Sequence, residues 1–352
     1  MSSDQKRTPP ATETSDVSVG QGQAENVYVL PTRFRRAAVR KEQKWSLPRS
    51  FVGFRAIDPS HLSVRGAAPK CMIVSEADQN IWYMAKGAEN WAKQETYTEF
   101  FINRLGETLG FPMAHCGLVL VDGELRFVSR NFLVEGESLT HGSLLLESFF
   151  ECDLDKVGKN PWDEQRTYDI EMIDELLRSY CGPDYQRIVE GLIEMLIFDA
   201  LIGSMDRHMQ NWGIIATAKV PRAHHFAPIF DSARALFWDY TEERLQRISI
   251  NTHALEGYAN RARPKIGCAK FGKTVNHFEL VQYLHRKYPV EIEKAKSKVT
   301  GENLKKSQGL MREYPFRTAF SSLRRETILR ILDIRQRRLQ KAFELREESH
   351  GA

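Results

Sequence analysis

The sequence predicts an α+β protein of two lobes, in which a β-rich N-terminal part precedes a helical C-terminal part. Two short apolar runs, KCMIVS and IWYMAKG, flank a polar turn between residues 70 and 87 and predict a β-hairpin. After about residue 135 the apolar residues recur at helical spacing, most clearly over 163–180 and 185–201. This order predicts two lobes with a cleft between them.

The chain divides into three segments. Residues 1–26 are rich in Ser, Thr, Pro, Gly and Gln, so burial cannot offset the entropy of ordering them, and we expect a disordered tail. Residues 27–134 form the expected N-terminal lobe, in which a helix follows the first hairpin and a second hairpin spans 115–134. Residues 135–352 form the expected helical lobe, which ends in a long helix from about 322 to 347 whose apolar stripe faces the core.

The bulk properties exclude several classes of protein. The 352 residues carry a net charge of +4, which suits anionic ligands such as nucleotides but is too weak to predict direct binding of nucleic acid. Five scattered cysteines without a CxxC pair argue against a disulfide framework or a zinc site. The sequence has neither a transmembrane segment nor a secretory leader, so a cytoplasmic protein is expected.

The segment LIFDALIGSMDRHMQNWGIIA (196–216) carries the most informative pattern. Asp206 and Asn211 stand five positions apart, directly after an apolar helix and before a strand. This is the spacing of a kinase catalytic loop, which we place at 203–213. There the aspartate accepts the hydroxyl proton or orients the nucleophile, and the asparagine supplies a neutral oxygen ligand for Mg²⁺. His208, two positions after Asp206, is expected to orient the loop or to contact the phosphates.

A second carboxylate follows 25 positions after Asp206. The runs 212–217 and 226–231 predict a small hairpin, and its second strand ends in Asp231. One or two carboxylates with phosphate oxygens and water satisfy Mg²⁺, so Asp231 and Asn211 form the candidate metal site. The alternative is purely structural: these residues cap turns and fill a left-handed position.

The N-terminal part contains the groups that would hold a nucleotide. Lys86 ends the predicted strand IWYMAK, and Glu99 lies on the next helix, with Glu95 one turn earlier as a competing partner. A lysine on a strand that pairs with a glutamate on a helix positions the α- and β-phosphates in kinases. The segment SVRGAAPK (63–70) precedes the strands as a phosphate-covering loop should, although it is neither G-x-G-x-x-G nor a Walker A motif.

With these residues in order, the sequence resembles the HipA-like kinase family, in particular the HipA C-terminal kinase domain. The similarity spans roughly residues 60–240. The matching strings are SVRGAAPK, WYMAK, TEFFINRLGETLGFP, FDALIGSMDRHMQNWG and APIFDSARAL. The family commonly has Asn where this chain has Ser204, and few residues precede Ser63, so the separate N-terminal domain of many family members is expected to be missing or reduced.

The resemblance implies a bilobal protein-kinase-like fold with ATP and Mg²⁺ in the cleft. It makes Asp206, with His208 beside it, the catalytic residue, and Asn211 and Asp231 the Mg²⁺ ligands. It places the hinge near 130–134. The residues that it assigns to nucleotide binding are Ser63, Gly66, Lys70, Lys86, Glu99, Arg130 and Phe132. Ser63 also matches the serine that some family members autophosphorylate.

The resemblance further implies a serine/threonine protein kinase that acts as a toxin or effector. Its expected substrate is a translation factor or an aminoacyl-tRNA synthetase, and its expected regulator is an antitoxin-like protein. Two alternatives stay open. D-R-H-x-x-N also resembles the catalytic loop of phosphatidylinositol kinases, and residues 232–270 mix aromatic and basic side chains as a membrane-facing segment would. The other alternative is a nucleotide-binding pseudokinase.

Overall fold

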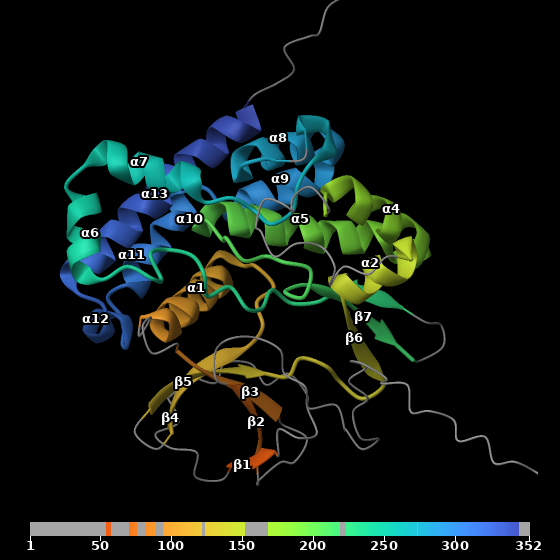
Figure 1. Cartoon of the computed structure of the whole chain (residues 1–352), viewed down its shortest axis with the longest axis horizontal. Helices are drawn as coiled ribbons and strands as arrows, with labels where there is room; N and C mark the ends of the chain where they lie inside the picture. The colour runs from red at the N-terminus through yellow and green to blue at the C-terminus, as the bar shows by residue number, and fades with distance from the viewer. Residues whose placement is uncertain are drawn as a thin grey trace, which may run out of the picture.

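The computed structural model describes residues 54–57, 70–75, 82–88, 94–121, 124–151, 168–218, 223–272 and 274–344. The expected tail at 1–26 and two members of the expected phosphate loop, Ser63 and Gly66, lie outside these ranges. The described part is a mixed α/β fold. Two antiparallel sheets lie on one side of a group of helices (Figure 1).

The first sheet has five strands in the order β1-β2-β3-β5-β4, and every neighbouring pair is antiparallel. Its strands are β1 (Phe54–Ile57), β2 (Lys70–Ser75), β3 (Trp82–Gly87), β4 (Cys116–Val121) and β5 (Glu124–Arg130). Both predicted hairpins, β2–β3 and β4–β5, are confirmed. Lys70 opens β2 directly opposite Lys86 on β3, so the register places Lys86 near the end of the central strand.

Helix α1 (Glu95–Leu109) packs against β4 and β5 and separates the five-stranded sheet from the remaining helices (Figure 1). It ends where predicted, because Gly110 takes the left-handed conformation with φ of 83° that favours glycine. Phe101 packs edge to face on Phe316 of α12 (Phe316–Ala319), with ring centroids 5.3 Å apart. This aromatic contact ties α1 to the helical side of the molecule and fixes the residues that α1 presents to the sheet.

The second sheet has three antiparallel strands in the order β6-β7-β8. They are β6 (Glu137–His141), β7 (Gly213–Thr217) and β8 (His224–Phe226). The expectation of helical structure directly after 135 was wrong at β6, because all five residues of ESLTH are half-buried and show no apolar alternation. The prediction of a strand over 226–231 was also wrong: β8 ends at Phe226, and Ile229 makes only an isolated bridge to Met113.

The helices after β6 enclose α5, which is apolar around most of its circumference and buried along most of its length. Helices α4, α8, α9 and α13 pack on it. The helices are α2 (Gly142–Phe150), α4 (Ile170–Cys181), α5 (Tyr185–Ile202), α6 (Glu242–Ser249), α7 (Thr252–Arg261), α8 (His277–Lys287), α9 (Pro289–Lys298), α10 (Gly301–Leu304), α11 (Lys306–Leu310) and α13 (Ser322–Glu344). Within the ranges given above, none of them has the length and hydropathy needed to cross a bilayer.

The predicted helix over 185–201 is confirmed as α5. Of the other two predicted helices, residues 163–167 and 345–347 lie outside the described ranges. The segment expected as a helix from 163 begins at Ile170, because Asp169 is extended and its carboxylate accepts a hydrogen bond from the backbone N–H of Met172 at 2.9 Å. The final helix begins at Ser322 as predicted, and its apolar stripe, which includes Ile328 and Leu332, is buried in the core.

A hydrogen-bonded carboxylate joins α4 to α5 and α8. Burial alone would raise the pKa of Asp174, but hydrogen bonds from Tyr185, Tyr288, Lys287 and Arg178 outweigh it and hold the pKa at about 2. Because the folded pKa lies below the unfolded value, this carboxylate stabilises the fold above about pH 4 and the contribution is lost as the pH falls toward 2. Asp174→Asn should therefore lower the free energy of unfolding at pH 7 by about 1–3 kcal/mol.

Urea unfolding at pH 7 and at about pH 2.5 measures this effect, and the difference from the wild type should shrink at the lower pH, which lies between the unfolded and the folded pKa of Asp174. Asp333→Asn is the control, because Asp333 is 61% exposed and its ion pair with Arg337 lies on the surface of α13. An Asp174→Asn loss no larger than that of the control would contradict the role given to this cluster.

Candidate active site

Lys86 is surrounded by three carboxylates that come from two distant parts of the chain. Its Nζ lies 3.0 Å from Asp231 Oδ1, 3.2 Å from Glu99 Oε2 and 3.9 Å from Glu95 Oε1. The lysine side chain is only 12% exposed, and both glutamates are buried. Of the two glutamates left open by the sequence, Glu99 is thus the nearer partner, with Glu95 behind it.

The pKa values of this group depend on one another. Burial alone would lower the pKa of Lys86, but Glu99, Asp231 and Glu95 together raise it, so the ammonium stays charged. Burial raises the pKa of Glu99 to about 7, Lys86 opposes the rise, and the neighbouring carboxylates add to it. Lys86 is thus held as a cation among three carboxyl groups, and two of these, Asp231 and Glu95, disfavour the charged form of the third, Glu99.

The expected catalytic loop begins at the end of α5. Gly203 takes the left-handed conformation with φ of 73°, and the backbone N–H groups of Gly203 and Ser204 both donate to the Asp199 carbonyl, at 2.9 and 3.0 Å. The Ser204 carbonyl lies 2.8 Å from Nε2 of the buried His277. Burial lowers the pKa of His277 well below its usual value, so the neutral ring serves as the donor. Ser204 is therefore held through its backbone.

The loop is closed by hydrogen bonds among the residues that the sequence selected. Asn211 donates from Nδ2 to the Asp206 carbonyl at 2.8 Å, and the His208 backbone N–H donates to the same carbonyl, also at 2.8 Å. The backbone N–H of Asn211 donates in turn to the His208 carbonyl at 2.9 Å. Asn211 is buried, and with Nδ2 engaged its Oδ1 is the atom left for a metal or a donor.

The Asp206 carboxylate is partly exposed and lies among cations. Its Oδ2 is 3.4 Å from Nε of Arg234, and the Asp206 side chain is 24% exposed. Burial raises the pKa of Asp206, and Asp231 adds to the rise, whereas Arg234, His208 and Lys265 oppose it. Asp206 therefore combines access to solvent with a carboxylate that binds a proton more readily than a free one does, as a proton acceptor requires.

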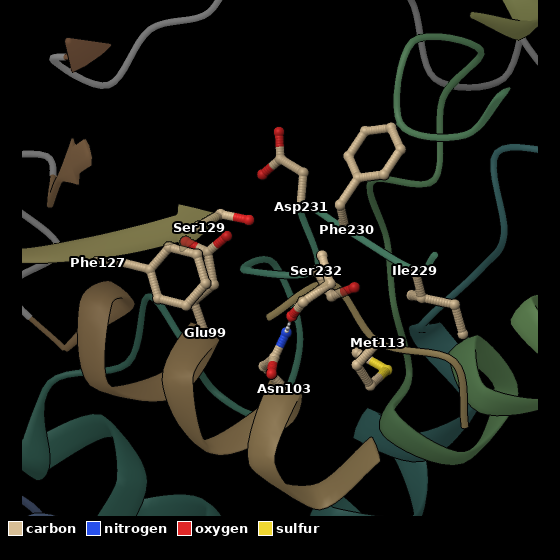
Figure 2. Close-up of a pocket in the computed structure, with 10 residues that line it drawn as sticks. Glu99, Asn103, Met113, Phe127, Ser129, Ile229, Phe230, Asp231 and Ser232 are labelled. Carbon is tan, nitrogen blue, oxygen red and sulfur yellow. Dashed lines mark hydrogen bonds between the residues drawn. The ribbon is translucent and has the colours of Figure 1, made fainter. Parts of the chain in front are cut away.

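Asp231 lies in irregular backbone after β8 and not at the end of a strand, contrary to the prediction. Its φ of 49° is in the left-handed region, which Asp tolerates better than most residues. The preceding Phe230 packs between Phe132, at 5.9 Å between ring centroids, and His141, at 6.0 Å. Figure 2 shows Asp231 at the edge of a small pocket that Glu99 of α1 and Ser129 of β5 also line. This segment thus brings Asp231 to the Lys86–Glu99 pair.

One buried cation near the site, Arg207, was not predicted from the sequence. The side chain is 1% exposed and forms a bidentate ion pair with Asp199 of α5, at 2.8 and 2.9 Å. It also donates to the carbonyls of Asn211 and Phe230, at 2.8 and 2.7 Å, and to Ser232 Oγ at 2.8 Å. An arginine between the predicted catalytic aspartate and His208 was visible in the string DRH, but nothing in the pattern shows that its side chain points inward.

The remaining predicted residues lie apart from this centre or at its edge. The structure does not describe the side chain of Lys70, whose backbone opens β2. Arg130 ends β5, and its backbone N–H donates to the His115 carbonyl at 2.7 Å. Phe132 reaches the site through its ring contact with Phe230.

Gly203 offers a test of how the loop is held. A Cβ there would lie 3.1 Å from the guanidinium of Arg335, and its positive φ is unfavourable for alanine. Gly203→Ala should lower the free energy of unfolding by about 1–2 kcal/mol. Gly257→Ala is the matched control, since a Cβ in the middle of α7 meets nothing within 4 Å. Urea unfolding measures the free energy of unfolding of both variants, and equal values for the two would contradict the prediction.

Two solved structures share the fold of this chain. The fold is similar to that of the Helicobacter pylori proinflammatory kinase CtkA, with a TM-score of 0.65 and 16% identity over 84% of this chain and 98% of that one. It is also similar to HipA in the Shewanella oneidensis toxin–antitoxin complex of HipA, HipB and operator DNA. There the TM-score is 0.53 and the identity 10%, over 87% of this chain and 77% of that one. These likenesses establish the fold.

The sequence supplies the family. The HipA-like C-terminal domain matches residues 62–298, about two thirds of the chain, and the protein therefore belongs to that family. No curated protein matches the sequence. The resemblance expected from the motifs is thus confirmed at the level of the family.

Proposed function

We propose that this protein is an ATP- and Mg²⁺-dependent kinase of the HipA type, which phosphorylates serine or threonine of a protein substrate. The observation that carries the proposal is the 3.0 Å contact of Lys86 with Asp231, two residues 145 positions apart. It joins a lysine on a central strand, paired with a helix glutamate, to the carboxylate that follows the catalytic loop. In kinases this set holds the phosphates and the metal. The proposal includes a two-lobed organisation, with nucleotide between the five-stranded sheet and the helices.

The segment after β5 is the proposed adenine site. Within it the backbone N–H groups of Asn131, Leu133 and Val134 already donate to protein oxygens, at 2.8, 3.1 and 3.0 Å. That of Arg130 is also engaged. Phe132 therefore provides the backbone N–H for adenine, and the carbonyl oxygens of this segment provide the acceptors. Lys86 binds the phosphates at the other end of the nucleotide.

The donor set near Lys86 fits Mg²⁺. Asp231 offers a carboxylate and Asn211 a neutral amide oxygen, and Mg²⁺ takes one or two carboxylates and completes its shell with phosphate oxygens and water. Across the described ranges, no cluster of three or more His, Cys, Asp or Glu side chains is placed to hold a metal by itself. A site of two protein ligands thus relies on the phosphates to complete it. When bound, the metal neutralises charge on the transferring phosphoryl group.

Asp206 is the proposed base for the acceptor hydroxyl. Its partly exposed carboxylate orients the hydroxyl and accepts its proton, while Arg234 at 3.4 Å pairs with one of its oxygens. His208 holds the loop through its backbone contact with the Asp206 carbonyl, and its charge bears on the Asp206 carboxylate. Arg234 contacts the Asp206 carboxylate and His208 contacts the Asp206 carbonyl. These contacts fix the position of Asp206 before an acceptor binds.

The similarity to the HipA of a solved toxin–antitoxin complex supports the further proposal of an antitoxin-like regulator. The acceptor is proposed to be a protein of translation, such as an aminoacyl-tRNA synthetase.

A phosphoryl-transfer assay tests the function. The purified protein is incubated with γ-labelled ATP and Mg²⁺, alone, with cell lysate and with phosphoinositide vesicles. Label in protein supports it. Label confined to lipid would replace it with the lipid-kinase alternative, and nucleotide binding without any transfer would make the protein a pseudokinase.

A further inference from the structure

The side chain of Arg207 contacts three separate segments of the chain. Its partners are Asp199 on α5, the carbonyl of Asn211 in the catalytic loop, and the carbonyl of Phe230 with the hydroxyl of Ser232 after β8. An arginine has five N–H donors, and these five hydrogen bonds, all between 2.7 and 2.9 Å, use every one of them. The guanidinium is therefore fully committed and has no free edge for substrate.

The two carbonyls that Arg207 binds belong to the backbone of the proposed metal site. One is the carbonyl of Asn211 itself, and the other is that of Phe230, whose peptide leads into Asp231. Both carbonyls bond to the same nitrogen, Nη1, so their separation is limited by two hydrogen bonds of 2.8 and 2.7 Å. A change in this contact would move one metal ligand relative to the other.

The conformation of Asp231 adds a second reason for such a restraint. Its φ of 49° is unusual for a residue other than glycine, and such conformations persist where the surroundings fix them. Arg207 holds the residues on both sides of Asp231, through the backbone carbonyl of Phe230 and the side-chain hydroxyl of Ser232. Asp199 fixes the plane of the guanidinium through its bidentate contact.

We propose that Arg207 is a positioning residue that sets the distance between Asn211 and Asp231 and thereby the affinity of the site for Mg²⁺. The inference rests on the proposed function, because it takes these two residues as metal ligands. Lysine cannot replace arginine here, since it has three donors on one nitrogen and lacks the planar fork that matches a carboxylate. Residues behind metal ligands typically change metal affinity by about 10–100-fold when substituted.

The test is Arg207→Lys with Arg324→Lys as its matched control. Arg324 is likewise 1% exposed, pairs with Glu242 at 2.8 Å, and donates to the carbonyls of Phe237 and Tyr240. Both variants thus remove the same kind of buried fork, but only Arg207 contacts the metal-site backbone. The probes are a non-hydrolysable ATP analogue titrated by calorimetry without metal, and Mn²⁺ binding to the protein–analogue complex followed by electron paramagnetic resonance.

Arg207→Lys should weaken Mn²⁺ binding by about 10–100-fold with metal-free analogue binding unchanged, and Arg324→Lys should change neither. Equal Mn²⁺ affinities for the wild type and Arg207→Lys, or equal weakening in both lysine variants, would overturn the inference while leaving the proposed function intact. A wild-type protein that binds neither the analogue nor Mn²⁺ with it would overturn both. The proposed function is thus judged on the wild type, and the inference on the difference between the variants.

If Arg207→Lys does not fold, as judged by circular dichroism, Ser232→Ala takes its place. It removes the hydroxyl that accepts from Nη2 and leaves the ion pair with Asp199 intact. The expected result is a smaller weakening of Mn²⁺ binding in the same direction. Ser249→Ala is its control, because that buried hydroxyl donates only to the Gln246 carbonyl at the end of α6. Equal Mn²⁺ affinities for the two alanine variants would overturn the inference.

Discussion

Asp206→Asn should abolish phosphoryl transfer while leaving the fold intact. The substitution keeps the size and the backbone contacts of the residue but removes the oxygen that accepts the hydroxyl proton. Proton transfer to a positioned side chain typically contributes about 10²–10⁴-fold to the rate, and a loss of that size is expected in a γ-labelled ATP assay. Nucleotide binding should be retained, because Lys86 and Asp231 are unchanged.

Asp333→Asn serves as the control for the loss of one aspartate charge, since Asp333 lies on the exposed side of α13. Its transfer rate and melting temperature should equal those of the wild type. The role assigned to Asp206 would fail if the Asp206→Asn protein kept more than about a tenth of the wild-type rate, because a change of that size is below what loss of a general base produces.

Asp231→Asn should abolish transfer for a different reason. The substitution removes the only charged metal ligand proposed here. The backbone at this position should be unchanged, since Asn has nearly the size of Asp and adopts positive φ as readily. Metal stabilisation of the transition state is worth several kcal/mol. A loss of about 3 kcal/mol corresponds to a rate roughly 100-fold lower. Transfer measured over a range of Mg²⁺ concentrations should show that added metal does not restore the rate.

The stability of this variant separates metal binding from folding. Lys86 keeps Glu99 at 3.2 Å when Asp231 is replaced, and one source of repulsion at Glu99 disappears. The melting temperature should therefore change little in the absence of metal and nucleotide. Unlike the wild type, the variant should gain no thermal stability from Mg²⁺ added with an ATP analogue. A full Mg²⁺-dependent gain in Asp231→Asn would remove Asp231 from the metal site.

Much of the fold was predictable because its signals are local. Gly110 ends α1 through its own left-handed conformation, and the two hairpins of the five-stranded sheet follow from apolar runs beside polar turns. β6 was missed because its residues are half-buried and its partner, β7, lies more than 70 positions later. The start of α4 was misplaced because Asp169 is held extended beside Gly267, a contact that no local window contains.

Part of the candidate site was likewise predictable from local signals, and part was not. The spacing of Asp206 and Asn211 selected them only together with its place between an apolar helix and a predicted hairpin, and both of these signals are local in the sequence. Only the tertiary structure shows that Lys86 pairs more closely with Glu99 than with Glu95, because both glutamates lie on one face of α1. The Lys86 Nζ lies 3.2 Å from Glu99 Oε2 and 3.9 Å from Glu95 Oε1.

The sequence by itself determined the identity of the polar residues, their order along the chain and the family to which that order belongs. Only the tertiary structure decided that Asp231 lies outside any strand and has a positive φ, and that Arg207 points inward to bind the backbone on both sides of the proposed metal site. The physical reason is that arginine within a polar loop is ordinarily solvated. Its burial here depends on Asp199, Asn211, Phe230 and Ser232, which folding alone brings within hydrogen-bonding distance of one guanidinium.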